Sequence, residues 1–175
     1  NFFLSSKANN EIINNVLNLK DTYGKNKTGG NTKVQIEFVS ANPTGPLHVG
    51  HGRGAAIGDC LARLFEASGW IVTREFYYND AGEQINNLMH SVKASCQNIP
   101  THDPNFPADG YHGDYINEIA KAFLSMKTIE CQGQSIKGSG QIEDTKSIKE
   151  FSVAYLRNEQ DQDLIAFRTK FDVYS

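Results

Sequence analysis

Two histidines three residues apart mark the part of the sequence best suited to chemistry. His48 and His51 lie in the run Leu47-His48-Val49-Gly50-His51-Gly52-Arg53-Gly54. An imidazole can donate hydrogen bonds to phosphoryl oxygens as they gain charge during a displacement, which stabilises the transition state electrostatically. Residues three apart at the start of a helix project toward one side, so both rings can reach one phosphate. The spacing therefore predicts phosphate chemistry with His48 and His51 as catalytic residues.

The glycines around the histidines favour the same chemistry. Gly50, Gly52 and Gly54 let a ligand approach the backbone more closely than a Cβ would allow. The run lies between a strand pattern and a helix pattern, where open α/β sheets bind ligands and where helix N–H groups attract anions. No third metal ligand stands at a convincing spacing, so we assign no metal site.

The flanking elements form a predicted strand–helix–strand unit. Val34, Ile36 and Phe38 alternate with polar residues, which is typical of a strand. A helical pattern then runs to Gly69, and residues 70–78 are rich in β-branched and aromatic types. About 45 residues of this kind predict two parallel strands joined by a crossover helix. We expect one apolar stripe of that helix to be buried core: Ile57, Leu61, Leu64 and Phe65.

The remaining chain reads as mainly helical. We expect a helix opened by Asp80 as a capping box, with Ile85, Leu88, Met89 and Val92 inward. A Pro-rich loop follows over 96–111, and then a helix capped by Asp114 that buries residues up to Leu124. Residues 131–141 are polar and Gly-rich, which predicts an exposed loop. A last helix is expected over 144–167, followed by an apolar strand at 171–174.

The amino-terminal residues are expected to form a segment separate from the strand–helix–strand unit. An apolar strand-like start and an amphipathic helix run to Gly24, and the polar residues 25–31 are typical of a linker. The helix cannot bury its apolar face alone. The chain starts without Met in an apolar stretch and closes on a strand pattern, so we expect both ends to be cut from something longer.

Composition excludes several classes of protein. The 175 residues carry 17 Lys and Arg against 20 Asp and Glu, so a net charge of -3 gives no global basic field. No apolar run approaches the roughly 18 residues of a membrane span, and no signal-peptide layout is present. Three scattered cysteines predict neither a disulfide framework nor a zinc site. We expect a cytoplasmic, soluble protein.

Four sequence elements resemble one enzyme family. The run Pro43-Thr44-Gly45-Pro46-Leu47-His48-Val49-Gly50-His51 resembles the HIGH signature of class I aminoacyl-tRNA synthetases, and the wider string is similar to arginyl-tRNA synthetase. The residues in register are Glu37, Ser40, Asn42, Pro43, Pro46, His48, Gly50 and His51. Three later elements are also similar: 79–85 (NDAGEQI), 110–115 (GYHGDY) and 171–175 (FDVYS). Four matches in order are far more specific than one short motif.

The resemblance implies a role for each matching residue. It implies an α/β, Rossmann-like nucleotide-binding fold that activates arginine with ATP and Mg²⁺ and then transfers it to tRNA(Arg). The ATP-binding residues would be Thr44, Gly45, His48, Gly50, His51 and Gly54. The arginine-binding residues would be Glu37, Ser40, Asn42 and His48. Asp80 and Gln84 would either belong to the substrate pocket or serve as capping and surface groups.

The same resemblance implies that half of the active site is missing. The family also uses a basic Lys-Met-Ser-Lys-like loop from the second half of its fold and a helical anticodon-binding domain, and neither pattern occurs here. We expect residues 1–30 to be the tail of a tRNA-contacting domain plus a linker, and residues 31–95 to be the first half of the catalytic domain. Residues 96–150 would form a connective insertion and 151–175 a truncated return. The fragment is expected to be monomeric and inactive alone.

Other interpretations compete with this one. Gly50 to Ala55 formally satisfies the dinucleotide pattern G-x-G-x-x-A with Glu75 about 20 residues on, but some ten residues separate it from the strand. A nucleotidylyltransferase would share the histidine signature, and an inert tRNA-binding or assembly module could descend from a synthetase. We expect three other histidines to be structural or exposed: His90, His102 and His112. Tyr77 and Tyr78 are expected to pack in the core.

Overall fold

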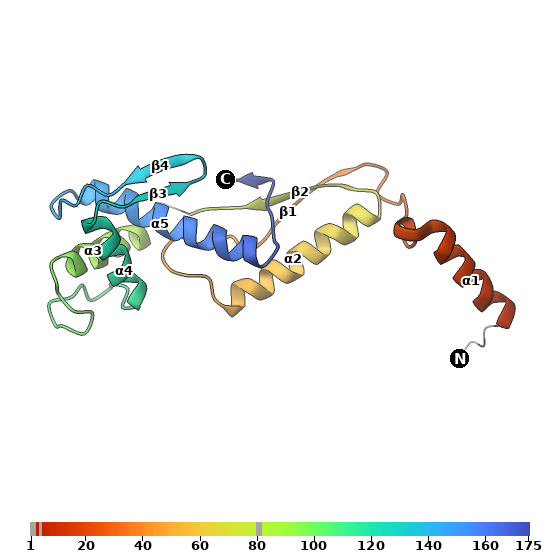
Figure 1. The fold of residues 1–175 in the computed structure, drawn as a ribbon, viewed down its shortest axis with the longest axis horizontal. Coiled ribbons are helices and arrows are strands. Elements are labelled where there is room, and N and C mark those ends of the chain that lie inside the picture. Colours follow the sequence, from red (N-terminus) through yellow and green to blue (C-terminus); the bar gives the residue numbers. More distant parts are fainter. Residues whose placement is uncertain (1–2, 4, 80–81) are drawn as a thin grey trace.

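The computed structural model describes residue 3, residues 5–79 and residues 82–175. Figure 1 shows three parts along the long axis of the molecule. Helix α1 (Ser6–Leu19) stands at one end, a small sheet with helix α2 (Val49–Ala67) lies in the middle, and a group of helices with a hairpin lies at the other end. The chain is an α/β protein with a mainly helical segment, as the sequence predicts.

The middle part is a parallel sheet of three strands. β1 (Lys33–Glu37) pairs with β2 (Ile71–Phe76) from Lys33 opposite Ile71 to Glu37 opposite Glu75, and β5 (Val173–Tyr174) pairs with β2. The strand order is therefore β1-β2-β5, with α2 joining the first two strands. The predicted strand–helix–strand unit is confirmed. We call these four elements the sheet unit.

Helix α2 contacts the sheet through small residues. Its buried positions are Ala55, Gly58 and Ala62, and a Cβ on Gly58 would come within 2.2 Å of the Phe38 ring. The helix backbone therefore lies close to β1, and larger side chains elsewhere on the helix are turned outward. The prediction that Ile57, Leu61 and Leu64 form the core is wrong, because all three are exposed.

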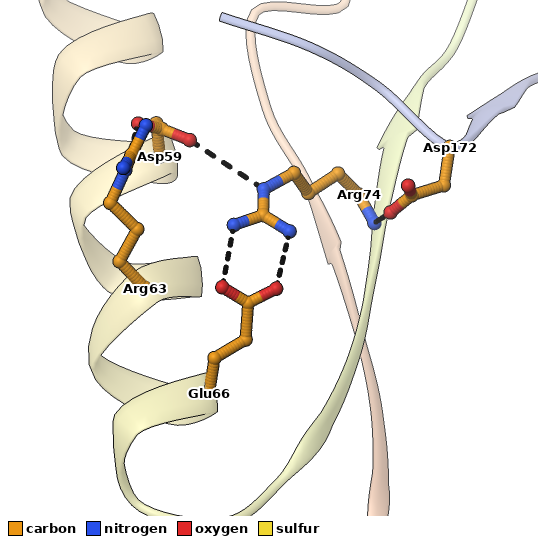
Figure 2. Close-up of polar contacts among 5 residues, drawn as sticks. All are labelled: Asp59, Arg63, Glu66, Arg74 and Asp172. Atoms are coloured by element: carbon orange, nitrogen blue, oxygen red, sulfur yellow. Dashed lines mark hydrogen bonds and ion pairs between the residues drawn. The ribbon is translucent and has the colours of Figure 1, made fainter. Parts of the chain in front are cut away.

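A network of charged side chains joins α2 to β2 and to the segment before β5 (Figure 2). Arg74 donates to both carboxylate oxygens of Glu66, at 2.7 and 3.0 Å, and its Nε lies 3.5 Å from Asp59. Asp59 also accepts a hydrogen bond from Arg63, and Asp172 accepts one from the backbone N–H of Arg74. The hydrogen bond from Arg74 lowers the pKa of Glu66. A bidentate pair of this kind fixes orientation as well as distance.

The third part has an apolar core of its own. It contains α3 (Glu83–Cys96), α4 (Asp114–Leu124), the antiparallel strands β3 (Thr128–Cys131) and β4 (Gln134–Lys137), and α5 (Thr145–Ala166). We call residues 83–166 the helical unit. Most of its fully buried apolar side chains meet in one cluster: Leu88, Val92, Ile116, Ile119, Phe123, Ile148, Phe151 and Leu156. Asp144 caps α5 by accepting from the N–H of Ser147, at the start of the last predicted helix.

Three local predictions in the helical unit need correction. Residues 131–141 hold the turn and the second strand of a hairpin over 128–137, because Gln132 and Gly133 both take a positive φ that closes a two-residue turn. Asp114 is the first residue of α4 and Gly113 is its N-cap, and Leu124 is exposed at the other end. Asp80 lies outside the described residues, and α3 begins at Glu83 after Gly82.

The amino-terminal helix stands apart from the other elements (Figure 1). α1 has no buried residue, and a 3-10 turn η1 (Lys20–Thr22) follows it. The predicted linker contacts the end of α2, because the N–H of Asn26 donates to the carbonyl of Ala67 and the N–H of Gly29 donates to that of Ser68. No helix in the described ranges is both long and apolar enough to cross a membrane.

Candidate functional site

Strained backbone leads out of β1 into the site. Val39 and Ser40 have φ values of 68° and 43°, which non-glycine residues rarely adopt. The hydroxyl of Ser40 accepts a hydrogen bond from the N–H of Tyr77 at the end of β2, at 3.2 Å. Strain of this kind persists where surrounding contacts fix it, and it concentrates at functional sites. Ser40, a predicted arginine-binding residue, is therefore tied to the carboxyl end of the sheet.

The next candidate residue contacts the first turn of α3. The side-chain amide of Asn42 donates to Oε1 of Gln84 at 2.7 Å. The two residues are 42 positions apart in the sequence and come from the loop between β1 and α2 and from the helical unit. The structure thus brings together two of the predicted substrate-pocket residues.

The two histidines together cap helix α2. His48 is the N-cap residue, and its Nδ1 accepts a hydrogen bond from the N–H of Gly50 at 3.1 Å. Nδ1 of His51 accepts from the N–H of His48 at 3.2 Å. A ring nitrogen that accepts a hydrogen bond carries no proton, so each neutral ring holds its proton on Nε2. The cap therefore leaves two Nε2–H donors at the positive end of a helix.

The two rings also influence one another. They stack with centroids 3.9 Å apart and an interplanar angle of 27°. Burial, and then the proximity of His48, lower the pKa of His51 below its usual value of 6.5. The neutral form of His51 is favoured because a charge on this ring would be partly desolvated and would face the other imidazole. Two Nε2–H donors at this place suit an anion whose charge grows during a reaction.

The glycines of the signature have separate roles. A Cβ on Gly50 would come within 2.9 Å of the His48 ring, so this position keeps space for the cap. A Cβ on Gly52 would meet nothing within 4 Å, and one on Gly54 would meet only the backbone nitrogen of Val39, at 4.0 Å. The space beside Gly52 and Gly54 is consistent with room for a ligand.

A small pocket opens beside the histidines. Its volume is about 120 Å³, and the last turns of α5 form the wall opposite the start of α2. The lining residues are Leu47, His48, His51, Gly52, Ala55, Asp163, Leu164 and Phe167. A larger cavity of about 740 Å³ lies between the β3–β4 hairpin and α5, and no predicted site residue lines it. The small pocket is the candidate site because both histidines line it.

The model of a known family matches this chain. The family is described as tRNA synthetases class I (R), catalytic domain, and the match covers residues 12–130, which is more than half of the chain. The chain belongs to this family. The match favours this family over a nucleotidylyltransferase, which would share only the histidine signature, and over a dinucleotide-binding protein, whose pattern leaves both histidines unexplained.

Individual relatives agree with the synthetase family. The chain is 53% identical over 175 residues to arginine–tRNA ligase of Geotalea uraniireducens, covering 100% of the chain and 31% of that protein. It is 52% identical over 177 residues to arginine–tRNA ligase of Geobacter metallireducens, with coverage of 99% and 32%. A crystal structure from Campylobacter jejuni, assigned as an arginyl-tRNA synthetase, superimposes with a TM-score of 0.77 at 32% identity and covers 98% of this chain and 36% of that one. The chain thus spans about a third of the length of these relatives.

One expected residue of the synthetase site stands apart from the others. Glu37 ends β1 and is exposed, and its carboxylate has no hydrogen-bond or ion-pair partner among the residues described. Its neighbour across the sheet is Glu75, whose carboxylate accepts hydrogen bonds from Ser175 and Gln35. Both hydrogen bonds lower the pKa of Glu75, and the bond from Ser175 has the larger effect. Of the two adjacent carboxylates, Glu37 is the one left available to a cation.

Sequence reasoning missed two residues that hold the synthetase signature loop. Tyr115 of α4 donates its hydroxyl proton to the carbonyl of Thr44 at 2.8 Å, and Gln160 of α5 donates to the carbonyls of Asn42 and Gly45. Thr44 and Gly45, predicted as ATP-binding residues, thus turn their carbonyls toward the helical unit. Tyr115 lies in one of the family-like elements, whereas nothing in the local pattern distinguishes Gln160.

The remaining aromatic and histidine predictions are largely confirmed. His90, His102 and His112 are all exposed. Tyr78 is buried, donates to Asp161 at 3.0 Å, and lies beneath the Arg157 guanidinium. Tyr77 is instead exposed, so the prediction that it packs in the core is wrong.

Proposed function

We propose that the protein containing this chain is an arginine–tRNA ligase. It would activate arginine with ATP to arginyl-adenylate and then transfer the arginyl group to tRNA(Arg). The observation that carries this proposal is the reciprocal histidine cap at the start of α2, in a chain of the arginyl-tRNA synthetase family. A cap of this form would supply two phosphate donors at the place where the family binds ATP.

In the first step, the carboxylate of arginine attacks the α-phosphorus of ATP. A new P–O bond forms, the bond to the β-phosphate breaks, and pyrophosphate leaves with its electron pair. Nε2–H of His48 and of His51 would donate to the phosphoryl oxygens as they gain charge, and the N-terminus of α2 would add its dipole. Gly52 and Gly54 would leave space for the nucleotide, and Gly50 would make room for the His48 ring that binds it.

The arginine side of the site would use the carboxyl end of β1. An arginine guanidinium pairs strongly with carboxylates, and Glu37 is an exposed carboxylate without a partner in the described part of the chain. Asn42, oriented by Gln84, and Ser40 would add polar contacts, with His48 near the substrate carboxylate. In the second step, a hydroxyl of the terminal adenosine of tRNA(Arg) attacks the arginyl carbonyl carbon, and AMP leaves.

Mg²⁺ would enter this site with the phosphates of ATP. Within the described residues, no group of three or more His, Cys, Asp and Glu is placed to hold a metal ion. We therefore assign no protein ligand to Mg²⁺. In an activation step of this kind, the ion would neutralise charge on the phosphates of ATP.

The domain assignment also belongs to this proposal. Residues 1–30 would end a tRNA-contacting domain, residues 31–95 and 151–175 would belong to the catalytic domain, and residues 96–150 would be the connective insertion. We further propose a monomeric, cytoplasmic enzyme whose other parts complete the site. The 175-residue chain alone would then be inactive.

A chimera tests the proposed function. In the G. uraniireducens arginine–tRNA ligase, the region matched by this chain is replaced by this chain, and charging of tRNA(Arg) with labelled arginine is measured. We expect arginine-specific charging, and a loss of about 10²- to 10³-fold in kcat for His48→Ala, because one transition-state donor is removed. His90→Ala, which changes an exposed histidine on α3, is the matched control and should charge normally. A folded chimera that charges no tRNA, or in which His48→Ala has no effect, would refute the proposal.

A further inference from the structure

The loop between β1 and α2 is held from the opposite end of the chain. Gln160 of α5 is fully buried, and its Nε2 lies 3.1 Å from the carbonyl oxygen of Asn42 and 2.9 Å from that of Gly45. These contacts join residues 118 and 115 positions apart. Gln160 is the only glutamine among the buried polar residues described. Its burial is therefore tied to the loop rather than to the apolar core.

Only the donor end of this side chain fits the loop. Both carbonyls are acceptors, so the amide must present its NH₂ group to them. Oε1 of Gln160 is buried and has no hydrogen-bond partner among the described residues. A buried acceptor without a partner destabilises the folded state. The two hydrogen bonds that Nε2 donates to the loop therefore have to offset the cost of the unpaired Oε1.

A second side chain holds the carbonyl between these two. The hydroxyl of Tyr115 donates to the carbonyl of Thr44 at 2.8 Å. Burial raises the pKa of Tyr115 to about 12, so this group remains a donor at neutral pH. Three carbonyls of the loop, at Asn42, Thr44 and Gly45, therefore accept from α4 and α5.

We propose that Gln160 is a positioning residue for the arginine and ATP sites, with Tyr115 as its partner. Gln160 holds the loop at Asn42 and Gly45. The side chain of Asn42 is bound to Gln84, and His48, three residues after Gly45, caps α2. One helical turn later, Leu164 of the same helix lines the histidine pocket. Helix α5 thus sets both the path of the loop and one wall of the pocket. The reaction that this positioning serves rests on the proposed function.

The first test measures the loop directly, in the 175-residue chain without ligand. Amide hydrogen exchange of residues 44–51 is compared between the native chain and Gln160→Leu, which keeps the bulk and removes both donors. Phe151→Leu is the matched control, because it changes a buried residue of the same helix that lies in the apolar cluster of the helical unit. We expect exchange in 44–51 to rise at least tenfold in Gln160→Leu and to stay within twofold in Phe151→Leu. Equal rates in all three chains would overturn the proposal.

The second test measures the consequence for catalysis in the chimera. Gln160→Leu should lower kcat/KM for arginine at least about tenfold, mainly through KM, at a temperature where it is fully folded. Tyr115→Phe should lower it less, because a single donor is lost. The double variant should lose less than the product of the two effects, since both side chains hold one loop. A Gln160→Leu enzyme with unchanged kcat/KM, or one matched by Phe151→Leu, would overturn the proposal.

The two tests separate this inference from the function on which it rests. If exchange rises in Gln160→Leu while the unsubstituted chimera is folded but charges no tRNA, the clamp on the loop is supported and the assignment of the reaction fails. If the chimera charges tRNA and exchange is unchanged in Gln160→Leu, the enzyme assignment holds and the positioning role fails.

Discussion

In the helical unit, α3, α4 and α5 close around one large apolar cluster, whereas the sheet unit has a smaller cluster around Phe76, and α2 is joined to the strands by small residues and charged pairs. Phe123, Ile148 and Phe151 are fully buried in the former. In the latter, α2 buries only Ala55, Gly58 and Ala62, and the bidentate pair of Arg74 with Glu66 fixes helix to strand. The candidate site nevertheless lies at the start of α2. The part that performs the proposed chemistry therefore depends on the part with the stronger core.

The largest expected effect is a loss of core in the helical unit. Phe123→Ala should lower the free energy of unfolding by about 3–5 kcal/mol, because it removes a fully buried aromatic ring and leaves a cavity. Leu61→Ala on the exposed face of α2 should change it by about 0.5 kcal/mol or less. Urea unfolding followed by circular dichroism measures both. Equal losses would show that the two units do not differ as described.

The next effect concerns the close approach of α2 to β1. Gly58→Ala should destabilise the chain by about 1–3 kcal/mol, because the new Cβ would overlap the Phe38 ring. Gly52→Ala is the matched control on the same helix, where nothing lies within 4 Å of the new Cβ. Its stability should rise slightly through helix propensity. The same urea experiment decides, and a stabilised Gly58→Ala would contradict the packing described.

A smaller effect is expected from the charged network in Figure 2. Arg74→Lys keeps the charge but cannot form the two parallel hydrogen bonds to Glu66, so we expect a loss of about 1 kcal/mol. Lys146→Ala is the comparison, because its ion pair with Glu150 is long and exposed. Thermal unfolding at low and high salt should show a clear loss for Arg74→Lys alone. Equal losses of thermal stability in both variants would show that the charged network does not stabilise the sheet unit.

The smallest effect is a pH dependence at the histidine cap. The pKa of His51 is lower in the folded chain than in the unfolded chain, so folding opposes its protonation. The contribution of His51 to the stability of the folded chain is therefore complete above about pH 6.5 and is lost as the pH falls through the lowered pKa. His51→Gln keeps an acceptor for the cap but does not titrate. Between pH 7.5 and 5.5 the native chain should lose more stability than His51→Gln, as measured by urea unfolding.

Local pattern predicted most of the architecture. The alternation of apolar and polar residues correctly predicted strand β1. The helical spacing of Ile85, Leu88 and Val92, which are all buried, correctly predicted helix α3. The hairpin over 128–137 was missed because its turn, Gln132-Gly133, lies among polar residues that obscure the alternation. The buried face of α2 was misassigned because glycine and alanine carry no apolar signal, although they set how closely the helix approaches the strand.

The candidate site shows a similar limit. The histidines and glycines were predictable because the site chemistry requires their types and spacing within a few residues. Gln160 was not, since its role arises from contacts with residues more than a hundred positions away. The unusual backbone at Val39 and Ser40 was also invisible, because neither residue type favours a positive φ.

The central claim is that this chain carries the residue that recognises arginine, and Glu37→Gln in the chimera tests it most directly. The change removes the charge of an exposed carboxylate without changing its size. We predict a loss of about 10- to 100-fold in kcat/KM for arginine, with KM for ATP within twofold of the native value. Glu118→Gln, an exposed carboxylate on α4, should leave both unchanged. A Glu37→Gln enzyme that keeps its native kcat/KM for arginine would contradict the account.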